Sequence, residues 1–120
     1  TLALDAVDIF NPDISGVGGI IDMIKIIKLS HEKKVTVSPH CWNSMSIAAS
    51  AMVHVCMSFT NTEMAEFFPE YIPYSLRFSN QNYEIKDGFV KIEDNEGLGI
   101  NIDTKLLMED TSSYRETELT

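Results

Sequence analysis

The sequence contains few cysteines and few basic residues. Its two cysteines, Cys41 and Cys56, are too few for a disulfide framework, and their spacing matches no zinc motif. Nine Lys and Arg face eighteen Asp and Glu, and the net charge of −9 disfavours binding to nucleic acid or to an anionic membrane. No apolar run approaches the roughly 20 residues of a membrane span, and no signal-peptide pattern is present. We therefore expect a soluble, cytoplasmic protein that binds neither nucleic acid nor membrane.

The residues that are present can form a core, because 44% of the 120 residues are apolar. The first five residues include no initiator Met and resemble the interior of a longer sequence. We therefore expect these 120 residues to be the C-terminal part of a larger protein.

The first half of the chain has the pattern of repeated βα units. Short apolar segments predict parallel strands at residues 6–10, 35–37 and 62–67, and amphipathic periodicity predicts helices at residues 19–32 and 45–58. The side chains predicted to point inward are Ile20, Ile21, Met23, Ile24, Ile27 and Leu29 in the first helix and Ile47, Ala48, Ala51, Met52, Val55 and Cys56 in the second. Alternating strands and helices of this kind place the chain in the α/β class.

The pattern changes after Phe67. We predict an irregular, proline-punctuated segment at residues 69–74, a hairpin of residues 83–85 and 89–92 around an Asp-Gly turn, and a short helix capped by Asp103 and ending at Leu107. From Glu109 onward the sequence has no periodicity and few apolar residues, so residues 110–120 are expected to form a disordered tail.

Asp13, His40 and Glu66 follow the three predicted strands at intervals of 27 and 26 residues. Because parallel strands end at the same edge of their sheet, these side chains are expected to meet at one mouth. A histidine at a strand end, backed by a carboxylate, is suited to proton transfer. Asp13 would accept the Nδ1 proton of His40, fix its tautomer and raise its basicity.

Each of these residues also has a purely structural interpretation. His40 could be a loop histidine bonded to a backbone carbonyl, and Asp13 could cap the glycine-rich loop that follows it. Glu66 competes with Glu63 on the opposite strand face, and either could be a solvated charge. Cys41 is a poor partner for His40 in a nucleophilic pair, because neighbouring side chains on an extended chain diverge.

The sequence resembles the enolase superfamily, and its mandelate racemase branch in particular, at Asn11-Pro12-Asp13-Ile14-Ser15-Gly16-Val17-Gly18-Gly19-Ile20 and at Val37-Ser38-Pro39-His40. The resemblance extends over about residues 5–108 and includes the Gly97-Leu98-Gly99-Ile100 turn. It implies that residues 1–67 form strands six to eight of a modified TIM (β/α) barrel, with their helices. Residues 68–109 would then return to an α+β capping domain.

The resemblance also implies roles for the three spaced residues. Asp13 and His40 would form a His–Asp dyad with His40 as the base, and Glu66, rather than Glu63, would hydrogen-bond the substrate carboxylate as it becomes an enediolate. Mg²⁺ is the implied cofactor, with its ligands upstream of this chain and none within it. The implied substrate is a small hydroxy-carboxylate, and the implied intact protein is a homo-oligomer.

We expect the intact protein to be a sugar-acid (aldonate or aldarate) dehydratase, because the His–Asp dyad is present and the sixth strand, which carries Asp13, has no lysine. A racemase or epimerase of a 2-hydroxy acid, or a truncated, non-catalytic relative, are the alternatives, and the 120 residues alone are expected to be inactive. Trp42 and Asn43 follow the base where specificity is set, and they are predicted to bind substrate, although Trp42 could instead plug the barrel rim.

Overall fold

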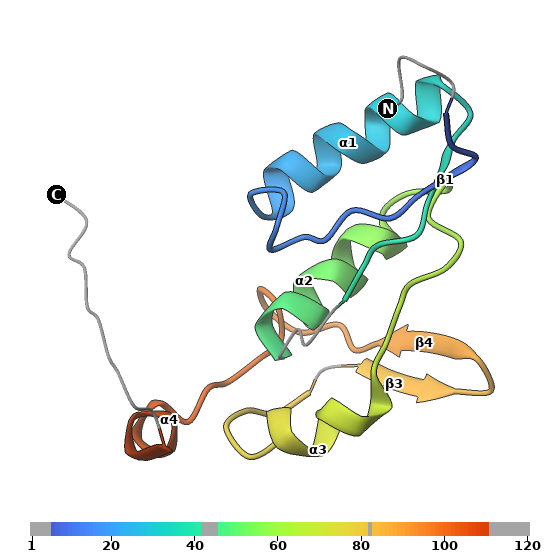
Figure 1. The fold of residues 1–120 in the computed structure, drawn as a ribbon. Helices are drawn as coiled ribbons and strands as arrows, with labels where there is room; N and C mark the ends of the chain where they lie inside the picture. The colour runs from blue at the N-terminus through green and yellow to red at the C-terminus, as the bar shows by residue number, and fades with distance from the viewer. Residues whose placement is uncertain (1–5, 42–45, 82, 111–120) are drawn as a thin grey trace, which may run out of the picture.

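The computed structural model describes residues 6–41, 46–81 and 83–110 (Figure 1). Within these ranges no helix is both long enough and apolar enough to cross a membrane. In chain order the elements are β1 (Ile9–Phe10), α1 (Ile20–Glu32), β2 (Thr36–Val37), α2 (Ser46–Met57), the 3-10 helix η2 (Pro69–Tyr71), α3 (Ile72–Ser75), β3 (Tyr83–Lys86), β4 (Phe89–Ile92) and α4 (Thr104–Asp110).

β1 and β2 pair in parallel, with Ile9 opposite Thr36 and Phe10 opposite Val37. Both strands are shorter than the predicted ranges 6–10 and 35–37. The ladder is interrupted beyond Phe10 because Pro12 has no N–H to donate. Pairing then resumes as a single parallel bridge between Asp13 and His40, so the chain remains in register through the position where the predicted site lies.

Residues 62–67 were predicted as a third strand, and this prediction was wrong: they have no regular secondary structure. The segment lies beside β2 and is joined to it by Val37 N to Asn61 O at 2.8 Å and by Glu66 N to Pro39 O at 3.2 Å. Between these bonds a ladder would need an N–H from Pro39, which proline lacks. Pairing resumes at Glu66, one residue later than an unbroken parallel ladder would give.

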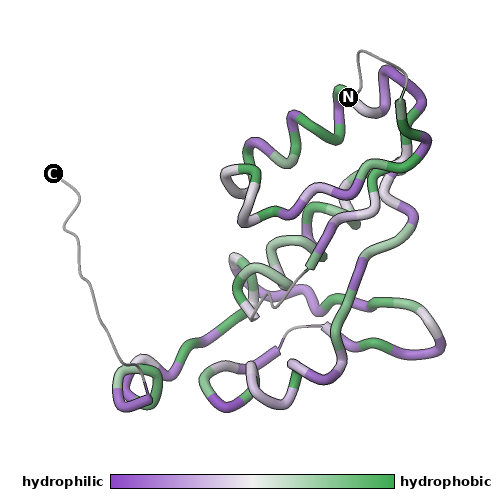
Figure 2. Tube along the Cα trace, in the orientation of Figure 1, coloured by the Kyte–Doolittle hydropathy of each residue, from purple (hydrophilic) through white to green (hydrophobic). Residues whose placement is uncertain are grey.

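The core lies between α1, α2 and the two-stranded sheet. Met23 and Ile27 of α1, Val37 of β2 and Met52 of α2 are almost completely buried in it. Figure 2 shows apolar residues along both helices and the paired strands. Burial of these side chains, at about 1.5–3 kcal/mol each, is the main stabilising contribution to the fold.

The inward-facing predictions for the two helices were partly wrong. Ile20, Ile21, Leu29 and Ile47 are exposed, and Ile21 has 70% of its surface accessible. In α1 only one stripe of residues, spaced three and four apart, reaches the core: Met23, Ile27 and Ser30. α2 contacts α1 on one side and β4 on another. Residues outside its predicted face are therefore also buried, namely Ser46, Ala49, Ser50 and Val53.

The second half contains the predicted hairpin, with Lys86 added to its first strand. Tyr83 pairs with Ile92 and Lys86 with Phe89. The two turn residues, Asp87 and Gly88, both have positive φ (52° and 81°), as a type I′ turn requires.

Two further predictions in this half were wrong. Residues 69–74 are not irregular but form η2 and α3, each with a proline in its first turn, where its fixed φ favours a helix. Asp103 caps α4 as predicted, since its Oδ1 accepts from Leu106 N at 2.9 Å. The helix extends past Leu107 to Asp110, whose carboxylate lies 3.2 Å from Arg77 Nη2. Residues 111–120 of the predicted tail lie outside the described residues.

The loop before α1 supplies a stability prediction. Gly18 and Gly19 have φ of +104° and +91°, and a Cβ at Gly18 would lie 2.7 Å from Asp22 Oδ2, whereas a Cβ at Gly19 would have no atom within 4 Å. We expect Ala at either position to lower the free energy of unfolding by about 1–2 kcal/mol. Gly18→Ala should cost about 0.5 kcal/mol more, because Asp22 must leave its 2.7 Å pair with Lys25. Urea unfolding of both variants measures the difference, and equal losses would contradict the proposed contact.

Candidate active site

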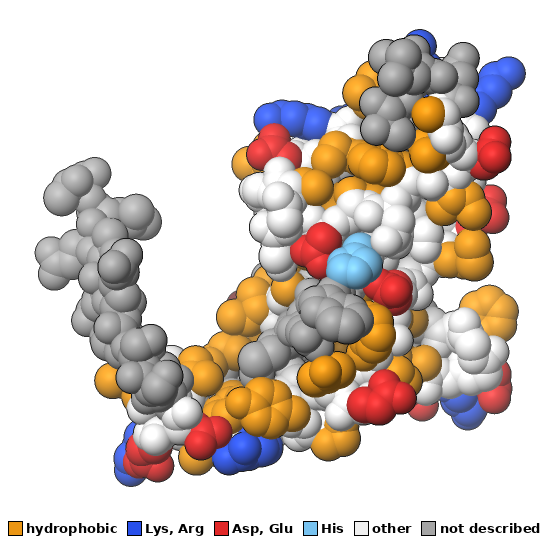
Figure 3. Space-filling view, in the orientation of Figure 1, with side chains coloured by type: hydrophobic (Ala, Val, Ile, Leu, Met, Phe, Trp, Pro, Cys, Tyr) orange, Lys and Arg blue, Asp and Glu red, His pale blue; other side chains and the backbone are white. Residues whose placement is uncertain are grey.

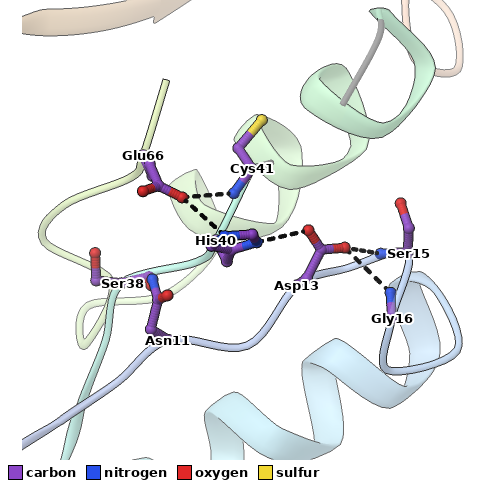
Figure 4. A network of polar contacts seen from close by, with 8 residues as sticks. All are labelled: Asn11, Asp13, Ser15, Gly16, Ser38, His40, Cys41 and Glu66. Carbon is purple, nitrogen blue, oxygen red and sulfur yellow. Dashed lines mark hydrogen bonds and ion pairs between the residues drawn. The ribbon is translucent and has the colours of Figure 1, made fainter. Parts of the chain in front are cut away.

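Asp13 and His40 lie directly opposite each other just past the ends of β1 and β2. His40 Nδ1 is 3.0 Å from Asp13 Oδ2 (Figure 4). A carboxylate can only accept a hydrogen bond, so in the neutral imidazole the proton is on Nδ1 and the ring nitrogen Nε2 carries the lone pair. The pair predicted from the 27-residue spacing is therefore in contact.

The second oxygen of Asp13 caps the glycine-rich loop. Asp13 Oδ1 accepts the N–H of Ser15 at 2.8 Å and the N–H of Gly16 at 3.1 Å. The two interpretations of Asp13 in the sequence, loop cap and partner of His40, are thus both correct, one for each oxygen. The loop bonds fix the plane of the carboxylate and so aim its Oδ2 at the imidazole.

The pKa of Asp13 is lower than its ordinary value of 3.8. Burial acts to raise this pKa, but the hydrogen bond with His40 and those from Gly16 and Ser15 together outweigh burial, and the charge of His40 lowers the pKa further. Asp13 is therefore ionised at neutral pH and able to orient the imidazole.

Glu66 lies on the other side of His40. Its Oε2 accepts the backbone N–H of Cys41 at 3.0 Å and is 3.6 Å from His40 Nε2, beyond normal hydrogen-bond length. Glu63 is exposed and contributes instead to a surface hollow at the start of β2, with Thr36 and Asn61. The structure thus brings Glu66, and not Glu63, to His40.

The three side chains remain accessible to a small molecule. The exposed side-chain fractions are 24% for Asp13, 32% for His40 and 37% for Glu66. In agreement with these values, Figure 3 shows a histidine between two acidic groups on the face of the molecule turned toward the viewer. An imidazole between two carboxylates at an open surface can take up and return a proton.

The remaining candidates do not contribute described side chains to this cluster. Trp42 and Asn43, predicted to bind substrate, lie outside the described residues. Cys41 is buried, with 4% of its surface exposed, and participates through its backbone N–H. Burial raises the pKa of the Cys56 thiol to about 12, with a further contribution from Cys41, which leaves it a poor nucleophile.

The sequence reasoning missed two groups near the pair: the N–H of Cys41 and the side chain of Asn11, which donates to Ser38 O. The Cys41 bond depends on where the irregular segment 62–67 places Glu66, which no sequence pattern indicates. Asn11 could have been found from the proline that follows it, because a proline inside a paired segment leaves a carbonyl without its donor.

The described residues do not fit a magnesium site. In residues 6–41, 46–81 and 83–110 no group of three or more His, Cys, Asp and Glu side chains is arranged to hold a metal ion. Asp13 uses one oxygen for the loop and the other for His40, and Glu66 is bonded to Cys41 N.

Fold and site together define an α/β protein with a His–Asp pair just beyond the carboxyl ends of parallel strands. The chain belongs to the family described as Enolase C-terminal domain-like, which it matches over residues 1–106. The predicted membership of the enolase superfamily and the α/β class are thereby confirmed.

Two curated relatives carry names of sugar-acid enzymes. The chain is 31% identical over 115 residues to D-galactarolactone cycloisomerase of Agrobacterium fabrum and 28% identical over 116 residues to D-galactonate dehydratase of Verminephrobacter eiseniae. Each alignment covers 90% of this chain and 30% of the relative. The chain thus spans less than a third of the length of these proteins.

Solved structures of enolases are also similar to this chain. An enolase from the environmental genome sequencing of the Sargasso Sea is 49% identical, with a TM-score of 0.85 over 90% of this chain and 29% of that chain. An enolase from Pantoea ananatis, solved with bound D-gluconate and Mg, is 25% identical, with a TM-score of 0.82 over 90% of this chain and 26% of that chain.

Proposed function

We propose that these residues form the acid–base half of the active site of a sugar-acid dehydratase, a hydro-lyase that acts on an aldonate or aldarate. In this proposal residues 1–67 are the last βα units of a (β/α) barrel, and residues 68–109 pack on a capping domain. The observation that carries it is the contact of His40 with Asp13 at 3.0 Å and with Glu66 at 3.6 Å. The D-galactonate dehydratase relatives support the substrate class.

His40 moves the proton in this reaction. With Nδ1–H held by Asp13, Nε2 takes the proton from the carbon next to the substrate carboxylate. The C–H bond breaks and its electron pair moves into the carboxylate, which becomes an enediolate. The enediolate then expels the hydroxyl of the next carbon, which leaves as water after taking a proton from His40 Nε2. The resulting enol becomes the 2-keto acid, so the net change is the loss of one water.

Glu66 is proposed to hydrogen-bond the substrate carboxylate while its charge increases. The bond from Cys41 N at 3.0 Å fixes Glu66 Oε2 beside the imidazole. This arrangement is set before the substrate arrives, and a preorganised group costs no reorganisation during the reaction.

The metal half of the site is proposed to lie in parts of the complete protein other than these described residues. The Pantoea ananatis enolase, with its bound Mg and D-gluconate, supports Mg²⁺ as the cofactor and a hydroxy-carboxylate as the substrate. Mg²⁺ bound to the carboxylate would make the neighbouring C–H more acidic.

An isomerase is the second candidate, favoured by the 31% identity to D-galactarolactone cycloisomerase. Both reactions can begin with proton transfer at the carbon next to a carboxylate. They differ in outcome, because a dehydratase releases water and forms a 2-keto acid, whereas an isomerase leaves the elemental composition unchanged.

Incubation of the complete protein with Mg²⁺ and a set of aldonates and aldarates tests the proposal. Semicarbazide trapping should detect a 2-keto acid, and mass spectrometry should detect the loss of water. A product of unchanged mass would show that the protein is an isomerase and not a dehydratase. If no acid reacts and no proton next to a carboxylate exchanges with D₂O, the site is non-catalytic.

Replacement of Glu66 and of Glu63 in turn distinguishes the roles of these two residues. Glu66→Gln keeps an oxygen for the Cys41 N–H but removes the charge beside His40. We expect kcat to fall about tenfold, which corresponds to about 1.4 kcal/mol of transition-state stabilisation. Steady-state kinetics with Glu63→Gln as the matched control should show no change for the control, and equal losses in both variants would contradict the role of Glu66.

A further inference from the structure

Pro12 removes one hydrogen bond from the strand pairing that carries Asp13 and His40. Phe10 O accepts from Ser38 N at 2.9 Å, and Pro12 O accepts from His40 N at 3.0 Å. In a parallel ladder these bonds alternate with bonds in the opposite direction, so the N–H of residue 12 would donate to Ser38 O. Proline has no N–H, and the ladder therefore lacks a donor for this carbonyl.

The side chain of Asn11 supplies that donor. Its Nδ2 donates to Ser38 O, and Figure 4 shows the amide turned toward Ser38. Asn11 and Ser38 are 27 residues apart, as are Asp13 and His40. The amide bond therefore lies two residues before the pair on both segments, and it holds the two segments in the register that places Asp13 opposite His40.

We propose that Asn11 is a positioning residue for the Asp13–His40 pair, a role that rests on the proposed function of that pair. Asn11 acts through the backbone: it replaces the bond that Pro12 cannot make and so sets the height of His40 relative to Asp13. A displacement of about 1 Å in a catalytic group can lower the rate about 100-fold. The bond thus matters more for the alignment of the pair than for the stability of the fold.

Asn11→Leu in the complete protein removes the donor while keeping a side chain of similar size. We expect kcat to fall at least about tenfold, with KM changed by less than about twofold. The control is Asn80→Leu, which removes an amide-to-carbonyl bond of the same kind, to Gly99 O at 3.1 Å, together with the bond that Asn80 Oδ1 accepts from Asn101 N; neither bond involves the segments of the pair. The control should keep its kcat.

Restoring the backbone donor provides a rescue. Pro12→Ala returns an N–H at the position from which the ladder bond to Ser38 O is missing. The double variant Asn11→Leu/Pro12→Ala should therefore recover most of the lost kcat, and Pro12→Ala alone should keep it. Failure of the double variant to recover, while Pro12→Ala alone remains active, would overturn the proposal.

A readout without catalysis separates this proposal from the proposed function. Diethyl pyrocarbonate modifies imidazoles, and mass spectrometry gives the modification rate of His40 relative to the exposed His31. The ratio should change several-fold in Asn11→Leu, because the contact of His40 Nδ1 with Asp13 Oδ2 that orients the ring is weakened, and it should return in the double variant. An unchanged ratio overturns the role of Asn11 even if the protein is a dehydratase. A changed ratio supports this role even if no sugar acid reacts.

The same labelling detects unfolding. If Asn11→Leu does not fold, the half-buried His54 is modified faster together with His40, both relative to the already exposed His31, and the double variant then provides the test. A folded double variant with the wild-type ratio supports the proposal, and a double variant that remains unfolded overturns it.

Discussion

Replacement of His40 by Asn is expected to lower turnover of sugar acids by the complete protein at least about 10³-fold. Asparagine still fits between Asp13 and Glu66, but it cannot take up a proton at neutral pH. Because the imidazole is proposed both to remove the proton and to protonate the leaving hydroxyl, both halves of the reaction depend on it. Measurement of kcat and of proton exchange in D₂O should show both lost together.

The matched control is His31→Asn. His31 is exposed in the last turn of α1 and lines a surface hollow with Thr36 and Glu63 instead of contacting the pair, so its loss should leave kcat unchanged. Circular dichroism and urea unfolding should show that His40→Asn folds like the wild type. Dehydration retained by a folded His40→Asn variant would contradict the assignment of His40.

The site was easier to predict from the sequence than the strands that carry it. The nearly equal spacings of Asp13, His40 and Glu66, 27 and 26 residues, were enough to predict that they lie together, because chain direction and strand order restrict where each strand ends. Two prolines determine where the strands end, which the spacing could not predict. Pro12 and Pro39 each remove a ladder donor, which shortens the parallel pairing and leaves residues 62–67 without regular structure.

The helix faces show a different limit of sequence reasoning. Apolar periodicity predicted each end of α1 and α2 to within one residue. It also assigned Ile21 and Leu29 to the core, whereas both are exposed in the structure. Periodicity gives the apolar stripe of a helix, and the neighbouring elements decide how wide a part of it is covered. For the same reason the sequence did not reveal that α2 is buried on more than one side.

Replacement of Asp13 by Asn is the second substitution with a large expected effect. The amide oxygen of Asn can still accept the N–H groups of Ser15 and Gly16, so the loop keeps its cap. Its NH₂ group would then face His40 Nδ1 and donate to it, which moves the imidazole proton to Nε2. The base would thus lose its lone pair at the reactive nitrogen, and we expect kcat to fall about 10²–10⁴-fold with a small change in stability.

The pH dependence of stability tests the same contact without substrate. The folded pKa of Asp13 is below its ordinary 3.8, so the carboxylate stabilises the folded state above pH 3.8. This contribution is lost as the pH falls through the folded pKa. Urea unfolding should therefore show wild type more stable than Asp13→Asn near neutral pH, with the difference disappearing in acid. If the stability difference between the two proteins does not depend on pH, the charged carboxylate of Asp13 does not interact with His40. Asp13 would then not fix the tautomer of the imidazole.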